Sequence, residues 1–390
     1  EAILKANKIE DSKAYMRWTA LRGSAGLLST EIENANFDFY GKKLTGAVKQ
    51  RPAEERALAT VNGRLGEALG KLYVAKKFPP EAKAKAQAMI VNVMKAFDNR
   101  IENLPWMTKA TKENAKIKLN KFRVKIGYPD QWKDYSALEV KSPEQGGTYF
   151  ENSRIYAQWG HNENMADLGK PVDKEEWGMS PQTVNAYFNP ANNEIVFPAA
   201  ILQPPFYDYK ADEAVNYGGI GAVIGHEISH GFDDSGSRYN AEGNLVNWWS
   251  DEDLKQFTTM GTALADQYSA LEPLPGIFVD GKFTLGENIG DLGGVNAAYD
   301  GLQIHLKEKG NPGLIDGYTP DQRFFISWAT IWRSKMRDEA IKNQVKTDPH
   351  SPGMYRAYVP LQNVEAFYKS FNIQPNNGMY LAPDDRVKIW

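Results

Sequence analysis

The sequence predicts a mainly α-helical protein with a small β-sheet. In several long stretches that Pro does not interrupt, apolar residues recur at intervals of three and four, the spacing of one helix face. Two short runs of strand-forming residues, 183–188 and 194–197, flank an Asn-Pro-Ala-Asn-Asn segment, which is turn chemistry for a hairpin. The 390 residues are enough for two domains with real cores.

Residues 1–128 have a helical pattern throughout. One apolar stripe predicts a single helix that begins near Pro52; its members are Leu58, Val61, Leu65, Leu69 and Leu72. A second helix is expected over 80–104, where Pro105 ends it, and a third over 108–122, whose many lysines we assign to a solvated face. Residues 142–147 are rich in Pro and Gly and mark a plausible domain boundary, although a loop inside one domain would look the same.

Two further helices are expected after residue 145. The helix over 250–270 has Ser250 as its cap and acids in its first turn, and the helix over 321–342 has aromatic residues that suit a core. The strand over 183–188 could offer free backbone groups to an extended peptide, with Asn185 adding hydrogen bonds. An ordinary hairpin strand is the alternative.

Composition excludes several classes of protein. With 42% hydrophobic and 24% charged residues, the chain is ordinary globular material. A net charge of −3 gives no argument for binding nucleic acid or an anionic membrane. The absence of Cys excludes disulfides and thiolate ligands. Because no initiator Met, signal peptide or apolar run of transmembrane length is present, we expect a fragment or a processed chain.

The motif that carries chemistry is His226-Glu227-Ile228-Ser229-His230. A Pro-free stretch over 211–224 predicts one helix running into it, and on a helix two residues four apart can point their imidazoles at one metal ion. Glu227 then stands about 100° round from His226, beside the ion, where a general base must stand. Glycines 218, 219 and 221 predict close packing and therefore a buried helix. The motif also arises in helices by chance.

A tetrahedral zinc site needs a third protein ligand and an open position. Glu287 is the candidate, and Asp291 lies four residues later, so a helix would put both carboxylates on one face. Asp291 could accept the outer N–H of a liganding His and fix its tautomer. The alternative is that both are ordinary helix-start acids, stabilised by the helix dipole.

A third signal lies in the Pro- and Gly-containing loop around His350, with Arg356 six residues later. Of the five His in the chain, this one could donate to a developing oxyanion, and an Arg could hold a substrate carbonyl or carboxylate. A surface loop His is the commoner explanation of this pattern on its own.

Together these pieces resemble the neprilysin family of zinc endopeptidases, in particular its cysteine-free bacterial members. The matching segments are 184–188, 226–234, 287–294, His350-Ser-Pro-Gly with Arg356, and 385–390. Their order and approximate separation match the family over essentially the whole chain. One departure is Gly290, where the family more usually has Ala, and we expect it to be harmless.

The resemblance implies a role for each matching residue. His226, His230 and Glu287 would bind one zinc ion, as in gluzincins, and Glu227 would be the base that takes a proton from the attacking water. Asp291 would be an acid beside the metal ligands that is counted among the catalytic residues, Asp233 would be another carboxylate behind the ligands, and His350 would stabilise the tetrahedral intermediate. Asn185 and Ala186 would bind the substrate backbone, and Arg356 a substrate carbonyl.

The resemblance also implies an architecture. We expect residues 146–390 to form a thermolysin-like zinc catalytic domain, and residues 1–145 to belong to an incomplete all-helical lid or linker region. The implied activity is hydrolysis of peptide bonds in oligopeptides, in a protein secreted or periplasmic in a bacterium, with a cytoplasmic location as the alternative. The chain's own N-terminal segment, as a separate chain, is a candidate partner.

Two other functions stay open at the level of the sequence. The first is an inactive zinc-bearing fragment that acts as a binding or scaffold protein. The second is a non-proteolytic binding protein in which the His-Glu-x-x-His motif is accidental, and the pairing of Glu287 with Asp291 argues against it.

Overall fold

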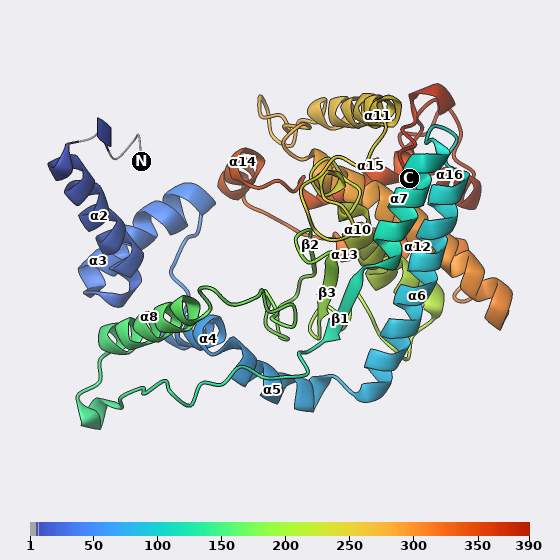
Figure 1. Cartoon of the computed structure of the whole chain (residues 1–390). Helices are drawn as coiled ribbons and strands as arrows, with labels where there is room; N and C mark the ends of the chain where they lie inside the picture. Colours follow the sequence, from blue (N-terminus) through green and yellow to red (C-terminus); the bar gives the residue numbers. More distant parts are fainter. Residues whose placement is uncertain (1–4, 7) are drawn as a thin grey trace. The chain divides into compact units, whose positions relative to one another are not determined.

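The computed structural model describes residues 5, 6 and 8–390; residues 1–4 and 7, which belong to the predicted helical region 1–145, lie outside the described part. The described chain is mainly α-helical with one three-stranded sheet, which confirms the predicted fold class. It forms two compact units (Figure 1), neither of which is continuous in sequence. The smaller unit takes the described residues up to 65 together with 133–173 and 337–340, and the larger takes 66–132, 174–336 and 341–390.

The smaller unit is built from helices with little buried surface. They are α2 (Ile9–Ser24), α3 (Thr30–Phe37), α4 (Ala53–Arg64) and α8 (Tyr149–Ala166), with short helical turns at Ala25–Leu27, Asp38–Lys43 and Pro143–Gln145. In α2, α3 and α4 no described residue is buried. Thr148 precedes helix α8 and caps it, because its hydroxyl accepts from the backbone N–H of Glu151.

The single helix predicted from the stripe over 58–72 is wrong. The chain leaves the helical conformation at Leu65 (φ −114°, ψ 39°), and a new helix, α5 (Gly66–Lys77), begins at the next residue. Of the predicted stripe, Leu58, Val61 and Leu72 are exposed. Glycines on both sides of the break, Gly63 and Gly66, lower the helix propensity there.

Helices α6 (Pro80–Asn103) and α7 (Lys109–Asn120) lie close to their predicted ranges. Pro80 occupies the first turn of α6. A backbone N–H at that position would have no partner within the helix, so proline costs no hydrogen bond there. One face of α6 enters the core of the larger unit; its buried residues are Ala82, Ala86, Met89, Ile90, Val93, Ala96, Phe97 and Ile101. The predicted solvated face of α7 is only partly right, because Lys118 is buried.

The sheet has the strand order β1-β3-β2, with β3 (Glu194–Pro198) buried at its centre. Strand β1 (Arg123–Gly127) runs parallel to β3, and β2 (Tyr187–Asn189) is its antiparallel partner on the other side. Two corrections follow. The region 1–128 is not all helical, since β1 lies in it, and the strand predicted over 183–188 is shorter and later. Strand β2 is an edge of this sheet, and Asn185 and Ala186 lie just before it.

The helical path into the His-Glu-x-x-His motif is confirmed, with one irregularity. It consists of α9 (Glu213–Asn216), a π-helical turn (Tyr217–Gly221) and α10 (Ala222–His230). A Cβ added at Gly218 would lie 2.1 Å from the carbonyl oxygen of Phe324, and one at Gly219 would lie 2.3 Å from that of Phe206. The glycines therefore permit close packing, and the predicted burial of this helix is confirmed.

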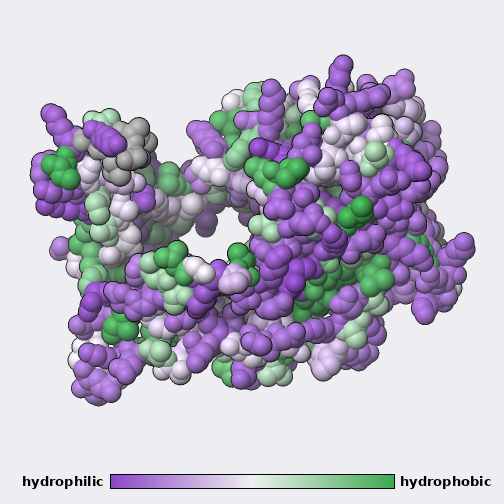
Figure 2. All heavy atoms as spheres, in the orientation of Figure 1, coloured by the Kyte–Doolittle hydropathy of each residue, from purple (hydrophilic) through white to green (hydrophobic). Residues whose placement is uncertain are grey.

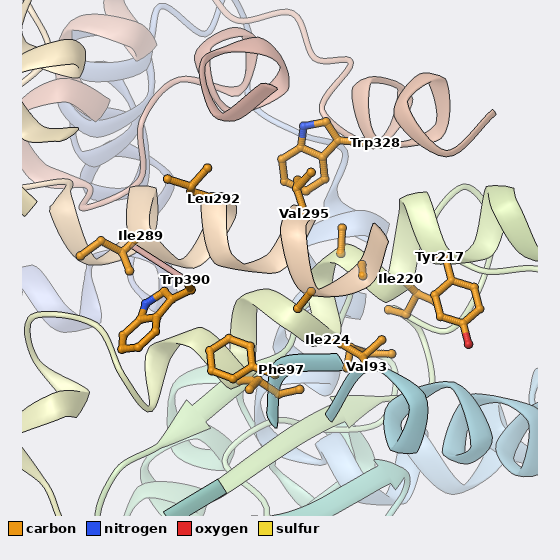
Figure 3. Close-up of a cluster of buried hydrophobic side chains, with 14 of the residues drawn as sticks. Val93, Phe97, Tyr217, Ile220, Ile224, Ile289, Leu292, Val295, Trp328 and Trp390 are labelled. Atoms are coloured by element: carbon orange, nitrogen blue, oxygen red, sulfur yellow. The ribbon is translucent and has the colours of Figure 1, made fainter. Parts of the chain in front are cut away.

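Helix α12 (Leu285–Lys309) runs through the core of the larger unit and packs against α10 and α6. Figure 3 shows Ile289, Leu292 and Val295 of α12 among apolar side chains from α6, from the path into α10, and from the end of the chain at Trp390. Helix α11 (Asp251–Ser269) also packs on α12 and is capped by Ser250 as predicted. This packing makes α10 and α12 the rigid pair on which the site is built.

The remaining helices are α13 (Pro320–Ile331), α14 (Asp338–Thr347), α15 (Gly353–Gln362) and α16 (Glu365–Phe371), with short turns at Gly236–Arg238 and Pro383–Asp385. The single helix predicted over 321–342 is therefore wrong, because the chain leaves it at Trp332. Its aromatic residues Phe324, Phe325 and Trp328 are core, as predicted.

The face drawn in Figure 2 is covered mostly by hydrophilic residues with scattered apolar side chains. Among the helices of the described residues, none has the length and apolar character needed to cross a bilayer.

Candidate metal centre and active site

Helix α10 presents His226 and His230 on one face, one turn apart. Their ring centroids are 4.4 Å apart and the ring planes are nearly perpendicular, at 85°. Both side chains, together with Glu227 between them, line a cleft of about 640 Å³ in the larger unit. The four-residue spacing therefore places the two imidazoles on one face of α10, as the sequence predicts.

Small residues bring α12 against this face. A Cβ at Gly225 would lie 2.6 Å from the carbonyl oxygen of Gly294, and one at Gly294 would lie 2.5 Å from that of Ala222. The two backbones are therefore closer than side chains would allow. Since the helices touch, the first turn of α12 carries Glu287 to the imidazoles of α10.

Glu287 completes a group of three possible ligands. One of its carboxylate oxygens lies 3.2 Å from Nε2 of His226, and the other lies 3.7 Å from Nε2 of His230. One donor atom from each of the three residues can be chosen so that all lie within 4.8 Å of one another. Burial opposes ionisation of Glu287, but the neighbouring histidines outweigh it and hold its pKa far below its ordinary value.

The outer nitrogen of each histidine faces a carboxylate. Nδ1 of His226 lies 2.9 Å from Oδ1 of Asp291, and Nδ1 of His230 lies 2.7 Å from Oδ2 of Asp233. A carboxylate in this place favours the tautomer with hydrogen on Nδ1, which leaves the lone pair of Nε2 for a metal. Burial disfavours a charged His226, but the carboxylates of Asp291 and Glu287 outweigh it and raise its pKa to about 10, so a metal would take the place of the proton on Nε2.

Asp291 is held in turn by Arg356 of α15. The guanidinium donates from Nε and Nη2 to the two carboxylate oxygens, both at 2.8 Å, and its plane lies over the ring of Trp332 at 3.9 Å from the centroid. All of Asp291 and most of Arg356 are buried. This paired geometry fixes the carboxylate that faces His226.

The donor set fits zinc. Two imidazole nitrogens and one carboxylate oxygen are the ligands of many catalytic zinc sites, which keep a fourth position open. One carboxylate oxygen of Glu227 is buried without a hydrogen-bond partner, and the buried oxygen of Glu287 that faces Nε2 of His226 and of His350 makes no well-oriented hydrogen bond. Buried oxygens of this kind are costly unless a cation or a water satisfies them. Burial raises the pKa of Glu227, and the two histidines oppose that shift.

The loop that carries His350 reaches the same centre. Nε2 of His350 lies 3.1 Å from Glu287, and its Nδ1 lies 2.6 Å from Oδ1 of Asp348. The Ser351 hydroxyl donates to Oδ1 of Asn288 at 2.9 Å, which ties the loop to α12 beside Glu287. The sequence interpretation did not identify Asp348 or Asn288 as functional. The sequence feature that could have identified Asp348 is the position of this acid, two residues before His350.

The predicted substrate-binding residues also line the cleft. Asn185 and Ala186 lie on one wall just before the edge strand β2, while Arg356 and His350 lie among the other lining residues. The structure therefore brings every predicted site residue to one cleft. Their individual roles stay predictions.

At Gly290 the structure shows a tight contact. A Cβ there would lie 2.8 Å from Cε1 and Nδ1 of His226, so an alanine requires a local shift of one helix or of the ring. The structure shows that the glycine fits against His226. It does not test the expectation that glycine in place of alanine is harmless.

Comparisons with known proteins agree with this arrangement. A family model described as peptidase family M13 matches residues 185–387, and a second model with the same description matches residues 1–129. Neprilysin-3 of Drosophila melanogaster is 36% identical over 402 residues, which cover 100% of this chain and 50% of that protein. The neutral endopeptidase of Lactobacillus helveticus is 36% identical over 391 residues, covering 100% of this chain and 58% of that protein.

Solved structures show the same fold. The zinc metalloprotease ZMP1 of Mycobacterium tuberculosis in complex with an inhibitor matches with a TM-score of 0.92 and 46% identity, covering 98% of this chain and 58% of that chain. The open state of the same protease matches with a TM-score of 0.76 and 47% identity, over 99% of this chain and 60% of that one. The chain thus spans about half the length of the curated relatives it matches. Because the family model over 185–387 covers more than half of it, the chain belongs to peptidase family M13, as the resemblance to neprilysin predicts.

Proposed function

We propose that this chain carries the active site of a zinc-dependent endopeptidase that hydrolyses peptide bonds in oligopeptides. The observation that carries the proposal is the convergence of three donor atoms, from His226, His230 and Glu287, within 4.8 Å of one another beside the buried carboxyl group of Glu227. Relatives that include a zinc metalloprotease and a neutral endopeptidase support the same reading.

One zinc ion would be held by His226, His230 and Glu287. When bound, it supplies a Lewis acid that makes a water molecule acidic enough to react at neutral pH and polarises the scissile carbonyl. Asp291 and Asp233 keep the two imidazoles oriented by accepting from their outer nitrogens.

Glu227 acts as the general base and then as the general acid. Its carboxylate takes a proton from the attacking water and later returns it to the leaving amine. Nε2 of His350 donates to the oxyanion of the tetrahedral intermediate, with Asp348 fixing the ring from the other side. Asn185 and the backbone at Ala186 hold the extended peptide next to the edge strand, and Arg356 donates to a substrate carbonyl.

The domain and partner assignments are part of the same proposal. Residues 146–390 supply the catalytic domain, and 1–145 belong to the helical lid or linker region, supported by the separate family matches over 185–387 and 1–129. As a partner we propose the protein's own N-terminal segment as a separate chain, and copurification tests that proposal. A secreted or periplasmic location is proposed by analogy with bacterial members, and cell fractionation tests it.

Glu227→Gln tests the assignment. The amide cannot take the proton, so the value of kcat/KM for a peptide is expected to fall by about 10²- to 10⁴-fold. Zinc content should stay unchanged, since Glu227 is not a proposed ligand. Glu252→Gln, an exposed glutamate on α11, is the matched control and should keep full activity. Peptidase activity retained in Glu227→Gln would remove the residue from the mechanism and favour another base.

A further inference from the structure

The larger unit contains a buried lysine that the proposed mechanism does not use. Lys118 of α7 is 1% exposed, although lysine is almost never fully buried in proteins without a partner. It does not contact a carboxylate within ion-pair distance in the described structure. Its ammonium group instead faces the backbone of the segment that follows the metal-binding helix α10.

Three backbone carbonyls of that segment accept from Lys118. Nζ lies 2.6 Å from the oxygen of Gly231, 2.7 Å from that of Gly236 and 2.7 Å from that of Tyr239. An ammonium has three N–H donors, so the three acceptors match its full capacity. One side chain thus closes the loop 231–239, which we call the post-helix loop, at its beginning, middle and end.

The post-helix loop carries Asp233, the carboxylate that faces His230. Oδ1 of Asp233 accepts from the backbone N–H groups of Ser235 and Gly236, at 2.8 and 2.7 Å, while Oδ2 lies 2.7 Å from Nδ1 of His230. Gly236 is therefore shared: its N–H orients Asp233 and its carbonyl accepts from Lys118. The chain of contacts runs from Lys118 to Gly236, to Asp233 and to the metal-facing ring of His230.

The surroundings of the ammonium are otherwise apolar. The rings of Phe188, Phe232 and Trp248 lie with their centroids 5.6 to 5.8 Å from Nζ. Burial lowers the pKa of Lys118 to about 7, and the nearby charge of Asp233 opposes that shift. In these apolar surroundings the three hydrogen bonds to carbonyls offset the free-energy cost of burying the ammonium group. The three carbonyls in turn have the ammonium group as a hydrogen-bond donor.

We propose that Lys118 is a positioning residue of the metal centre: it holds the post-helix loop so that Asp233 keeps the ring of His230 turned toward the ion. The proposal rests on the function proposed above. Lys118 is not among the residues that line the cleft of the site. It acts through a carboxylate, so its loss should weaken metal binding more than a change in overall stability explains.

The test compares Lys118→Met with Lys125→Met in the purified protein. Lys125 is also a buried lysine, 8% exposed, but it pairs with Glu194 in the sheet at 2.9 Å and does not reach the post-helix loop. Zinc affinity is measured by competition with a chromogenic chelator, and the melting temperature is measured with and without zinc. Lys118→Met should weaken zinc binding about tenfold, the lower end of what loss of an outer-shell partner costs. It should also reduce the rise in melting temperature that zinc produces.

Lys125→Met should lower both melting temperatures alike and leave zinc affinity within twofold of the wild type. Cobalt(II) in place of zinc adds a spectroscopic readout: the visible bands should change in Lys118→Met and not in Lys125→Met. The route through the loop is tested by Lys118→Met combined with Asp233→Asn. If Lys118 acts through Asp233, the double variant should lose no more zinc affinity than Asp233→Asn alone.

Unchanged zinc affinity and an unchanged cobalt spectrum in Lys118→Met would reduce Lys118 to a stabilising residue and overturn the proposal. Additive losses in the double variant would overturn the route through Asp233. Should Lys118→Met yield no folded protein, the same measurements on Lys118→Gln decide, because the amide keeps two of the three donors. A wild-type protein that binds no zinc is a separate outcome, since it would contradict the proposed function itself.

Discussion

At the scale of single residues, the site is a set of polar groups that each have a defined partner. The imidazoles face carboxylates, Asp291 is clamped by Arg356, and His350 is flanked by Asp348. The exception is one buried oxygen of Glu227 that accepts no hydrogen bond. Buried oxygens without a hydrogen-bond partner also occur away from the site, for example at Glu194 and Gln344, so the convergence of three possible ligand atoms is what marks the site.

His350→Ala is the residue-scale prediction. Removing the donor to the oxyanion should lower kcat by about 10²- to 10³-fold while KM for a peptide changes little. His161→Ala is the matched control, because His161 is exposed on α8. Steady-state kinetics on a fluorogenic peptide make the comparison. A rise in KM with kcat preserved would instead assign His350 to ground-state binding.

Residue types and spacing were enough to predict the candidate site, but not the residues that support it. His226, His230, Glu287 and Asp291 could be predicted because a helix converts a four-residue spacing into one face. Lys118 could not, since a lysine-rich helix has a solvated face by default, and only the tertiary fold puts one of its lysines under a loop. Asn288 could not be predicted either, because its partner Ser351 comes from a loop far along the chain.

At the scale of elements, the site depends on the contact between α10 and α12. Glycines at 225 and 294 let the backbones touch, and the burial of both helices offsets their poor helix propensity. The sequence predicted the helical path into α10 from a Pro-free stretch, whereas for α12 it supposed a helix at Glu287 and Asp291 without predicting its range. The sequence did not predict β1. The segment Arg-Val-Lys-Ile-Gly is too short to show a clear strand pattern, and it is a strand because it pairs with β3.

Gly294→Ala tests the helix contact. The added methyl carbon would lie 2.5 Å from the carbonyl oxygen of Ala222 and 2.7 Å from the backbone nitrogen of His226, so the helices must separate. We expect a loss of about 1–3 kcal/mol in the free energy of unfolding, together with weaker zinc binding. Gly261→Ala on α11, where a Cβ meets only Leu285 at 3.5 Å, should be neutral or stabilising by up to about 1 kcal/mol. Chemical denaturation of both variants measures the difference, and equal stabilities would contradict the close contact.

The link between α7 and α11 predicts a pH dependence. Asp253 is fully buried and accepts from Thr108, Thr111 and Ser250. Burial opposes its ionisation, but these hydrogen bonds outweigh it and hold the pKa of Asp253 below its ordinary value. A depressed pKa in the folded state stabilises the protein above the unfolded value of about 3.9, and the contribution is lost as the pH falls through the folded pKa.

Asp253→Asn should therefore unfold more easily than the wild type at pH 6, by about 2 kcal/mol. The difference should begin to shrink as the pH falls below the unfolded pKa of about 3.9, and it should disappear as the pH passes through the lower folded pKa. Urea denaturation at several pH values, with a chelator present throughout, separates this effect from zinc binding. A difference that stays constant down to acidic pH would show that the charge of Asp253 is not what matters.

At the scale of the whole molecule, every candidate site residue lies in the larger unit. That unit also includes residues 66–132, which contribute α6, α7 and β1 to the core under the site. The predicted division near residue 145 remains a prediction. The sequence did not predict that each unit is made of several separate segments of the chain. Such an arrangement depends on contacts between residues far apart in sequence rather than on local pattern.

The measurement that tests the account most directly is the zinc content per chain of the purified protein, after loosely bound metal has been removed. We predict about one zinc per chain in the wild type, lost in His226→Ala and retained in Glu227→Gln. This measurement does not depend on a complete lid, because the three proposed ligands come from α10 and α12 of one unit. A wild-type protein that holds no zinc even after reconstitution would contradict the metal centre, and the proposed peptidase mechanism would be withdrawn with it.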